Sequence, residues 1–323
     1  MLIIKKSSFS QKKKIKAIGN IMKKKMKSLL LINMTVLLSL LIFSGCSGKN
    51  EQVQDNSDDQ SESLIQCVEF EDKEMEYFRF GNKDGRKIII LPGVALKSVM
   101  SSAEAVISAY DILAKDYDVY LFDHIKIEPE DYSVEQMTDD TVKALNKLGL
   151  DHVNIIGISL GGMIGEVMAI KYPEIVEGLA LCSASANIKD KGLFEDWIKN
   201  AEERNVEKLM ISFGENIYTP EIYEQFKDAI LASGEGASDL DYENFIAANK
   251  AIINFNVEDE LEQIKCPVYI LGAGEDKVVG VQASLDMAER LKCDYYIYEG
   301  CGHGVYDEAA DYKERIKSFL DNN

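Results

Sequence analysis

The chain has 323 residues, and its 36 basic and 55 acidic side chains give a formal net charge of −19. With 46% apolar and 28% charged residues, its composition is typical of a globular protein and excludes wholesale disorder or a collagen-like fibre. The acidic balance also argues against a general nucleic-acid binder, which needs a basic surface to neutralise phosphate groups.

The first 45 residues differ in charge from the rest of the chain. They contain ten Lys and no acidic residue, so residues 46–323 carry 26 basic and 55 acidic groups. An uncharged stretch at 28–48 follows the lysines, with a Leu-rich core and small residues near its end. This order is typical of an export signal, so we expect residues 1–45 to be a signal peptide. Met22 precedes a basic segment of more usual length and is an alternative true start.

The end of this segment, Phe43-Ser44-Gly45-Cys46, is similar to the lipobox of bacterial lipoproteins, although Phe43 stands where an aliphatic residue is usual. The resemblance implies that Cys46 is lipidated and becomes the mature amino terminus. The alternative is an uncleaved membrane helix, which needs about 20 apolar residues, barely the number present. In either case we expect residues 64–323 on the outer face of the cytoplasmic membrane.

A polar segment follows the proposed lipidation site. Residues 47–63 contain one Val, no aromatic residue and several acidic residues. Such a segment cannot bury enough apolar surface to order itself. We therefore expect residues 46–63 to form a disordered tether with a reach of roughly 20–25 Å.

From residue 64 onwards, apolar strands alternate with helical stretches. The run 87–91 is continuously apolar, as in strands buried within a parallel sheet, and the helix that ends at 171 stops before Pro173. In chain order we expect strands at 64–70, 75–80, 87–91, 118–122, 153–158 and 176–182, with helices at 103–114, 134–148 and 162–171.

The alternation is interrupted once. Residues 193–264 are charged and helical without a clear strand, and strands then resume at 267–271 and 294–298 with helices at 281–291 and 306–320. Repeated strand–helix alternation predicts a parallel sheet covered by helices on both faces. The helical block predicts an insertion above the carboxyl edge of the sheet, where such folds bind ligands.

The strongest motif is Gly157-Ile158-Ser159-Leu160-Gly161, which follows an expected strand and opens a helix. A Ser on such a sharp turn is forced towards positive φ, and flanking glycines remove side chains that would collide there. The turn lifts the Ser159 hydroxyl above the sheet as a nucleophile and places the Leu160 amide where it can stabilise an oxyanion. The alternative is a Gly-Ser turn that serves only close helix–strand packing.

A serine hydroxyl needs a base, and the chain contains three His residues. His303 stands between two glycines directly after the last expected strand, at the carboxyl edge of the sheet, and is the candidate base. His152 precedes the strand that leads to Ser159, so we expect it on the surface at the opposite edge. His124 follows a strand, and we expect it to line the pocket and not to act as the base.

The third expected member is an acid that holds the imidazole tautomer and stabilises the imidazolium. Asp276 follows the strand at 267–271 and precedes a helix, and neighbouring Glu275 is the second choice. The alternative is a solvated loop acid or a helix N-cap.

The chain order Ser159, Asp276, His303 resembles that of the α/β-hydrolase superfamily, over about residues 70–320. The segments that are similar to its small-molecule esterase and lactonase-like branch are 157–164, 172–174, 176–181, 264–268 and the Gly-His-Gly turn. The resemblance implies one domain at 64–323 with a mostly parallel eight-stranded sheet. It also implies a helical cap inserted after the sixth strand, at about 188–264.

The family takes its second oxyanion donor from the loop after the third strand, which is 91–94 here. Pro92 stands where His is usual and cannot donate, but the Val94 amide can. The family often carries an Arg-Gly-x-Gly run after the next strand. This chain instead continues from Asp123 through His124 to Glu130, so the resemblance does not define that wall of the pocket.

We therefore expect a serine hydrolase that cleaves an ester, thioester or lactone of a small acyl substrate through an acyl-enzyme. The alternative is a catalytically inactive, surface-tethered binding protein, because a fold alone does not imply activity. We expect no metal or cofactor, since metal-binding spacings, a P-loop and G-x-G-x-x-G are missing from the sequence. The five cysteines after Cys46 are expected as buried thiols, with a Cys266–Cys293 disulfide as the alternative.

Overall fold

The computed structural model describes residues 63–323. The predicted signal peptide, the alternative start Met22, the lipidation site Cys46 and the predicted tether up to residue 62 lie outside these described residues. Within 63–323, no helix is both long enough and apolar enough to cross a membrane.

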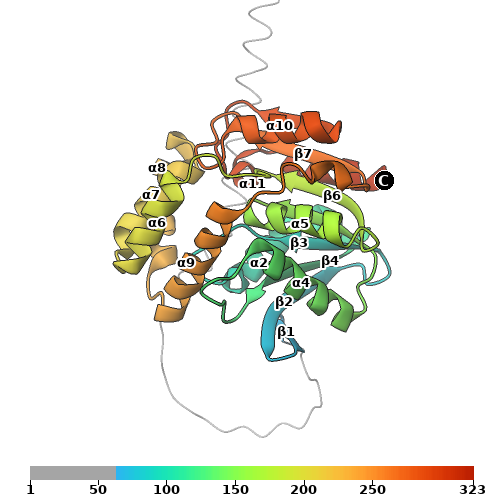
Figure 1. Ribbon diagram of the computed structural model, residues 1–323, viewed down its shortest axis with the longest axis horizontal. Coiled ribbons are helices and arrows are strands. Elements are labelled where there is room, and N and C mark those ends of the chain that lie inside the picture. Colours follow the sequence, from blue (N-terminus) through green and yellow to red (C-terminus); the bar gives the residue numbers. More distant parts are fainter. Residues whose placement is uncertain (1–62) are drawn as a thin grey trace, which may run out of the picture. The chain divides into compact units, whose positions relative to one another are not determined.

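Eight strands form one sheet in the order β1-β2-β4-β3-β5-β6-β7-β8 (Figure 1). Strands β1 and β2 run antiparallel to their neighbours, and every pair from β4 to β8 is parallel. The expected α/β fold with a mostly parallel eight-stranded sheet is therefore confirmed. The strands are β1 (Gln66–Phe70), β2 (Lys73–Gly81), β3 (Arg86–Leu91), β4 (Tyr117–Ile125), β5 (Val153–Ile158), β6 (Val176–Cys182), β7 (Val268–Ala273) and β8 (Asp294–Tyr298).

Helices cover both faces of the sheet. One hydrophobic cluster joins the sheet to α4 (Val134–Leu148), α5 (Leu160–Lys171) and α10 (Val281–Leu291). A second cluster, on the other face, includes residues of α2 (Ala103–Ala109), α3 (Asp111–Ala114), α11 (Val305–Glu308) and α12 (Tyr312–Asp321). Each strand between them must therefore bury side chains on both sides.

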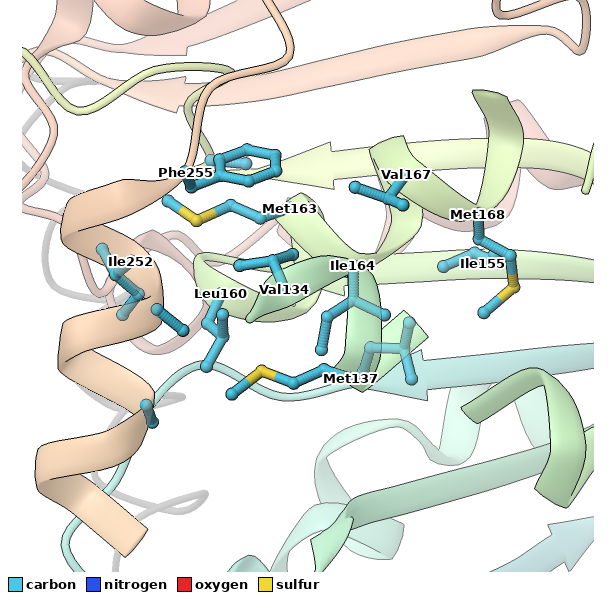
Figure 2. Close-up of a cluster of buried hydrophobic side chains, with 14 of the residues drawn as sticks. Val134, Met137, Ile155, Leu160, Met163, Ile164, Val167, Met168, Ile252 and Phe255 are labelled. Atoms are coloured by element: carbon cyan, nitrogen blue, oxygen red, sulfur yellow. The ribbon is translucent and has the colours of Figure 1, made fainter. Parts of the chain in front are cut away.

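Successive side chains of the central strands belong to the two clusters in turn. Ile89 belongs to the first cluster, whereas Ile88 and Ile90 belong to the second. Ile155 and Ile156 of β5 divide in the same way, because successive side chains of a strand point to opposite faces. This explains why these strands are continuously apolar in sequence. Figure 2 shows Ile155 beside the α5 residue Met168 in the first cluster.

Four α-helices lie between β6 and β7, as expected of a cap inserted after the sixth strand. They are α6 (Gly192–Glu202), α7 (Val206–Ile217), α8 (Pro220–Gly234) and α9 (Asp239–Asn254), grouped beside the sheet in Figure 1. The ring of Trp197 lies 5.5 Å from that of Phe194 and 4.9 Å from that of Phe213, and its Nε1 donates to Ser212 Oγ at 3.1 Å. These aromatic rings pack the cap helices together and belong to the same hydrophobic cluster as the sheet and α5.

Helix α9 links the cap to the sheet's helical layer. Figure 2 shows Ile252 of α9 and the following Phe255 close to Leu160 and Met163, which begin the helix after Ser159. All four side chains are nearly fully buried. The cap is therefore packed directly on the helix that carries the candidate nucleophile at its start.

Most expected bounds agree with the structure to within two residues, and three expectations differ by more. The helices expected at 103–114 and 306–320 are each divided in two. In the first, Tyr110 leaves helical geometry (φ −108°, ψ 19°) as its side chain is buried. In the second, Ala309 is extended (φ −95°, ψ 120°) while Glu308 binds backbone amides elsewhere. Finally, β4 continues to Ile125, three residues beyond its expected end, because Ile125 pairs with Met75 of β2.

Candidate active site

Ser159 occupies the turn between β5 and α5, in a strained conformation. Its φ is 52° and its ψ −116°, a region that side chains with a Cβ rarely adopt and that costs about 1–3 kcal/mol. The turn is held by the Ser159 amide, which donates to the carbonyl of Cys182 in β6 at 2.9 Å. The side chain is buried with 8% of its surface exposed.

The flanking glycines have a steric reason. A Cβ on Gly157 would lie 2.6 Å from the Gly161 carbonyl oxygen, and one on Gly161 would lie 2.0 Å from the Leu91 carbonyl oxygen. Both distances are far below van der Waals contact. The glycines therefore let the start of α5 approach both β5 and the end of β3, as the motif predicts.

Ser159, His303 and Asp276 form one hydrogen-bonded chain. The Ser159 Oγ is 3.0 Å from His303 Nε2, and His303 Nδ1 is 2.9 Å from Asp276 Oδ2. The three residues follow β5, β8 and β7, whose carboxyl ends meet at one edge of the parallel sheet. The structure thus brings together the three side chains that the sequence singled out.

Two backbone amides fix the orientation of Asp276. Its Oδ1 accepts from the amides of Val278 at 2.8 Å and Val279 at 3.0 Å, which leaves Oδ2 for His303. Burial alone would raise the pKa of Asp276, but His303 and the two amides outweigh that effect and lower the pKa below its ordinary value. The carboxyl group is therefore an ionised acceptor at neutral pH. Neighbouring Glu275, the second choice for this position, is exposed.

The loop of His303 is held by groups that the sequence analysis missed. Ser183 directly follows β6, has a φ of 48°, and donates its Oγ to the His303 carbonyl at 2.8 Å. Glu308 Oε2 accepts from the Gly302 amide at 2.9 Å, while its Oε1 accepts from Thr219 of the cap at 2.7 Å. The position of Ser183 at a strand end is a signal that could have been used. Nothing local marks Glu308, which is 89 residues from Thr219.

The two predicted oxyanion donors belong to segments that adjoin Ser159. Leu160 is the first residue of α5, so its amide is among those that a helix leaves without an intrahelical acceptor. Val94 follows Gly93, and a Cβ on Gly93 would lie 3.1 Å from the Ser159 Cβ. The loop after β3 therefore passes directly beside the serine despite carrying Pro92. The oxyanion role of Val94 and Leu160 stays a prediction.

The structure also places the other histidines and the cysteines that the sequence analysis considered. His152 is exposed just before β5, at the amino edge of the sheet, and His124 lines a cavity at the carboxyl edge. Cys266 and Cys293 are free thiols, so the disulfide alternative is wrong. The expectation of five buried thiols is also wrong in part, because Cys182 is buried but Cys67 is exposed on the edge strand β1 and the other three are half-buried. Across residues 63–323, there is no cluster of three or more His, Cys, Asp or Glu that could hold a metal ion.

Comparison with known proteins places the chain in a family. Residues 88–310 match the family model described as the alpha/beta hydrolase fold. The chain therefore belongs to the α/β-hydrolase family, and it is a hydrolase of that class.

Individual relatives are distant. RutD of Rhizobium rhizogenes, named as a carbamate hydrolase, is 25% identical over 223 residues, which cover 65% of this chain and 85% of the relative. The 3-oxoadipate enol-lactonase 2 of Acinetobacter baylyi is 20% identical over 160 residues, covering 50% of this chain and 60% of the relative. The crystal structure of the enol-lactonase from Burkholderia xenovorans LB400 superposes with a TM-score of 0.70. It has 18% identity and covers 79% of this chain and 100% of that one, which supports the fold.

Proposed function

We propose that the protein hydrolyses an ester, thioester or lactone of a small acyl substrate through an acyl-enzyme on Ser159. The observation that supports this most directly is the pair of hydrogen bonds that joins Ser159, His303 and Asp276. A serine hydroxyl is a weak nucleophile without a base, and a base works best when a third group orients it. This site offers both partners at hydrogen-bonding distance.

In the acylation step, Ser159 Oγ attacks the acyl carbon while its proton moves to His303 Nε2. The carbonyl oxygen becomes an oxyanion, for which the Leu160 and Val94 amides are the expected donors. Asp276 keeps the other imidazole proton on Nδ1 and stabilises the imidazolium. The intermediate collapses when the bond to the leaving oxygen or sulfur breaks, and the leaving group takes the proton from Nε2.

Deacylation repeats these roles with water. His303 Nε2 takes a proton from the water, whose oxygen attacks the acyl carbon bound to Ser159 Oγ. The second oxyanion collapses with release of the acid, and the proton returns from Nε2 to Ser159 Oγ. For a lactone, the acid and the alcohol leave as one hydroxy acid.

A fluorophosphonate tests this proposal, because it reacts covalently with activated serines. We expect one adduct in the intact mass of the full chain and none in Ser159→Ala, which removes only the hydroxyl. A panel of short esters, thioesters and lactones, with a carbamate included because one relative is named for it, then ranks the substrates. Folded wild-type protein that forms no adduct would contradict the proposal and favour a binding protein.

We also propose that Cys46 carries a lipid that holds the domain at the outer face of the cytoplasmic membrane. Its support is the lipobox-like sequence before Cys46 and the polar segment after it. Metabolic labelling with a radioactive fatty acid should mark the wild type and not Cys46→Ser. A labelled Cys46→Ser variant, or unlabelled wild type, would contradict this assignment.

A further inference from the structure

A cavity of about 230 Å³ adjoins the candidate active site on the side of β4. Its walls include Gly93 and Val94 from the loop after β3, His124 from the end of β4, Glu128 just after that strand, and Phe245 from α9. The loop that lines the cavity with Gly93 also lies against the nucleophile, since a Cβ on Gly93 would be 3.1 Å from the Ser159 Cβ.

The wall formed by His124 and Glu128 is held by both the sheet and the cap. The β4 strand continues past Asp123, and the Lys126 amide donates to the Glu74 carbonyl of β2 at 2.9 Å. From the cap, Asn244 Oδ1 accepts from the Glu128 amide at 3.1 Å, and its Nδ2 donates to the Lys126 carbonyl at 3.0 Å. This segment is one of the two in which the chain departs from the family's usual sequence, the other being the loop of Pro92.

Two polar atoms at this wall lack partners. His124 Nε2 and Glu128 Oε2 are both buried, and within the described residues neither has a hydrogen-bond partner. Such buried polar atoms are rare in native proteins unless a water or ligand completes them. Burial lowers the pKa of His124 and raises the pKa of Glu128 to about 8, so both side chains are mainly uncharged at neutral pH.

The other charges around the cavity disfavour an anionic ligand. Glu76, Asp123 and Asp241 also line it. Asp123 is already engaged, since it accepts from Ser98 Oγ at 2.5 Å and from the His124 amide at 2.9 Å. Of the two lining lysines, Lys126 pairs with Glu74 at 3.1 Å, whereas Lys97 donates to the neutral Glu235 carbonyl at 3.0 Å and keeps its charge.

We propose that this cavity binds an uncharged hydrogen-bonding group of the substrate, such as a hydroxyl or carboxamide, and that His124 and Glu128 select it. The proposal rests on the hydrolase function proposed above and specifies its substrate. A neutral imidazole and a protonated carboxyl group can each donate and accept, which matches a hydroxyl or an amide. A carboxylate would instead meet a lining in which three acids, Glu76, Asp123 and Asp241, face two lysines, one of which already pairs with Glu74.

The test compares three esters of equal length whose acyl chains end in a methyl, a hydroxyl or a carboxylate group. We expect wild-type kcat/KM to be highest for the hydroxyl ester and lowest for the carboxylate ester. In His124→Phe and Glu128→Leu, the hydroxyl-to-methyl ratio of kcat/KM should fall roughly tenfold, the effect of one lost hydrogen bond. His124→Gln, which keeps a donor and an acceptor, should restore part of the ratio.

Glu130→Gln is the matched control, because Glu130 lies on the same segment with 91% of its side chain exposed. Its ratio should equal that of the wild type. A wild type that prefers the methyl or carboxylate ester, or a ratio that is unchanged in both cavity variants, would overturn the proposal. Failure of the proposed function is distinguishable, since it would appear as a missing fluorophosphonate adduct and no turnover of any ester.

Discussion

At the scale of single residues, Asp276 has the most tightly specified environment of the candidate site. Its two carboxylate oxygens are divided between the backbone and His303, as the amides of Val278 and Val279 hold Oδ1. An isosteric substitution at Asp276 therefore changes which group faces the imidazole of His303, while the two amides still hold the side chain in place.

Asp276→Asn should lower kcat by on the order of 10³–10⁴-fold. The Asn oxygen would stay with the two amides, so its NH₂ group would face His303 Nδ1 and require the tautomer that places the proton on Nε2. That nitrogen could no longer take the proton of Ser159. Steady-state kinetics on a short ester would measure the loss.

Glu275→Gln is the control for this variant, because it changes the neighbouring exposed acid. It should retain wild-type kcat. If kcat fell equally in the two variants while their melting temperatures were unchanged, the negative charge of the loop alone would explain the loss. Asp276 would then have no specific role.

At the scale of elements, the close approach of α5 to β3 decides whether the nucleophile and the loop after β3 can lie together. A Cβ on Gly161 would meet the Leu91 carbonyl oxygen at 2.0 Å and the Pro92 carbonyl oxygen at 2.7 Å. Both atoms belong to the backbone, so no side-chain rotation can relieve the contact.

Gly161→Ala should therefore lower the free energy of unfolding by about 1–3 kcal/mol and strongly reduce activity. The helix or the loop must move, and either movement separates Ser159 from the predicted Val94 donor. Urea unfolding and ester turnover would measure the two effects. Gly300→Ala, which has open space around its Cβ, should change stability by less than about 0.5 kcal/mol.

The link between the cap and the His303 loop also belongs to this scale. Glu308 joins the amide of Thr219, between α7 and α8, to that of Gly302. On the other side of His303, the Gly304 amide donates to the Ile217 carbonyl at 2.8 Å. Glu308 therefore acts on His303 through its loop and is a positioning residue.

Glu308→Ala should reduce kcat about tenfold with a smaller change in KM, because it leaves two amides unpaired beside His303. The rate of fluorophosphonate labelling should fall in parallel, since it also depends on the base. Asp311→Asn, in the nearby exposed pair with Arg315, is the control and should keep both rates. A change confined to thermal stability would contradict the positioning role.

At the scale of the whole molecule, one buried acid is expected to make stability depend on pH. Glu166 of α5 is fully buried, and neither carboxyl oxygen has a hydrogen-bond partner in the described part of the chain. Burial raises its pKa to about 8 in the folded state, from 4.5 when exposed. Its folded form therefore keeps a proton that the unfolded chain releases.

The free energy of unfolding should consequently fall as pH rises from about 4.5 to about 8, by on the order of 4 kcal/mol for this group. Glu166→Gln stays neutral and should remove that part of the pH dependence. Urea unfolding of both proteins at pH 5 and pH 8 would measure the difference. Glu289→Gln, at an exposed position of α10, should leave the wild-type slope intact, and an unchanged slope in Glu166→Gln would contradict the prediction.

Local patterns in the sequence were sufficient for most elements and for the three side chains of the candidate site. The helix Val134–Leu148 and the strands Val153–Ile158 and Val176–Cys182 have the expected bounds, because apolar periodicity and capping act over a few residues. Ser159 and His303 were identifiable for the same reason. Glycines flank both residues and mark them in the sequence, although the reason for those beside His303 is distant, since a Cβ there would meet Ile217 or Tyr218.

Only the tertiary structure decided which distant groups hold and surround these side chains. Ser183 reaches His303 across 120 residues, and Asn244 reaches the segment after β4 across more than 100. Such contacts depend on how strands and the cap are assembled, so no local pattern records them. The extension of β4 likewise depends on pairing with β2, which is why the sequence ended that strand early and left the His124 wall undefined.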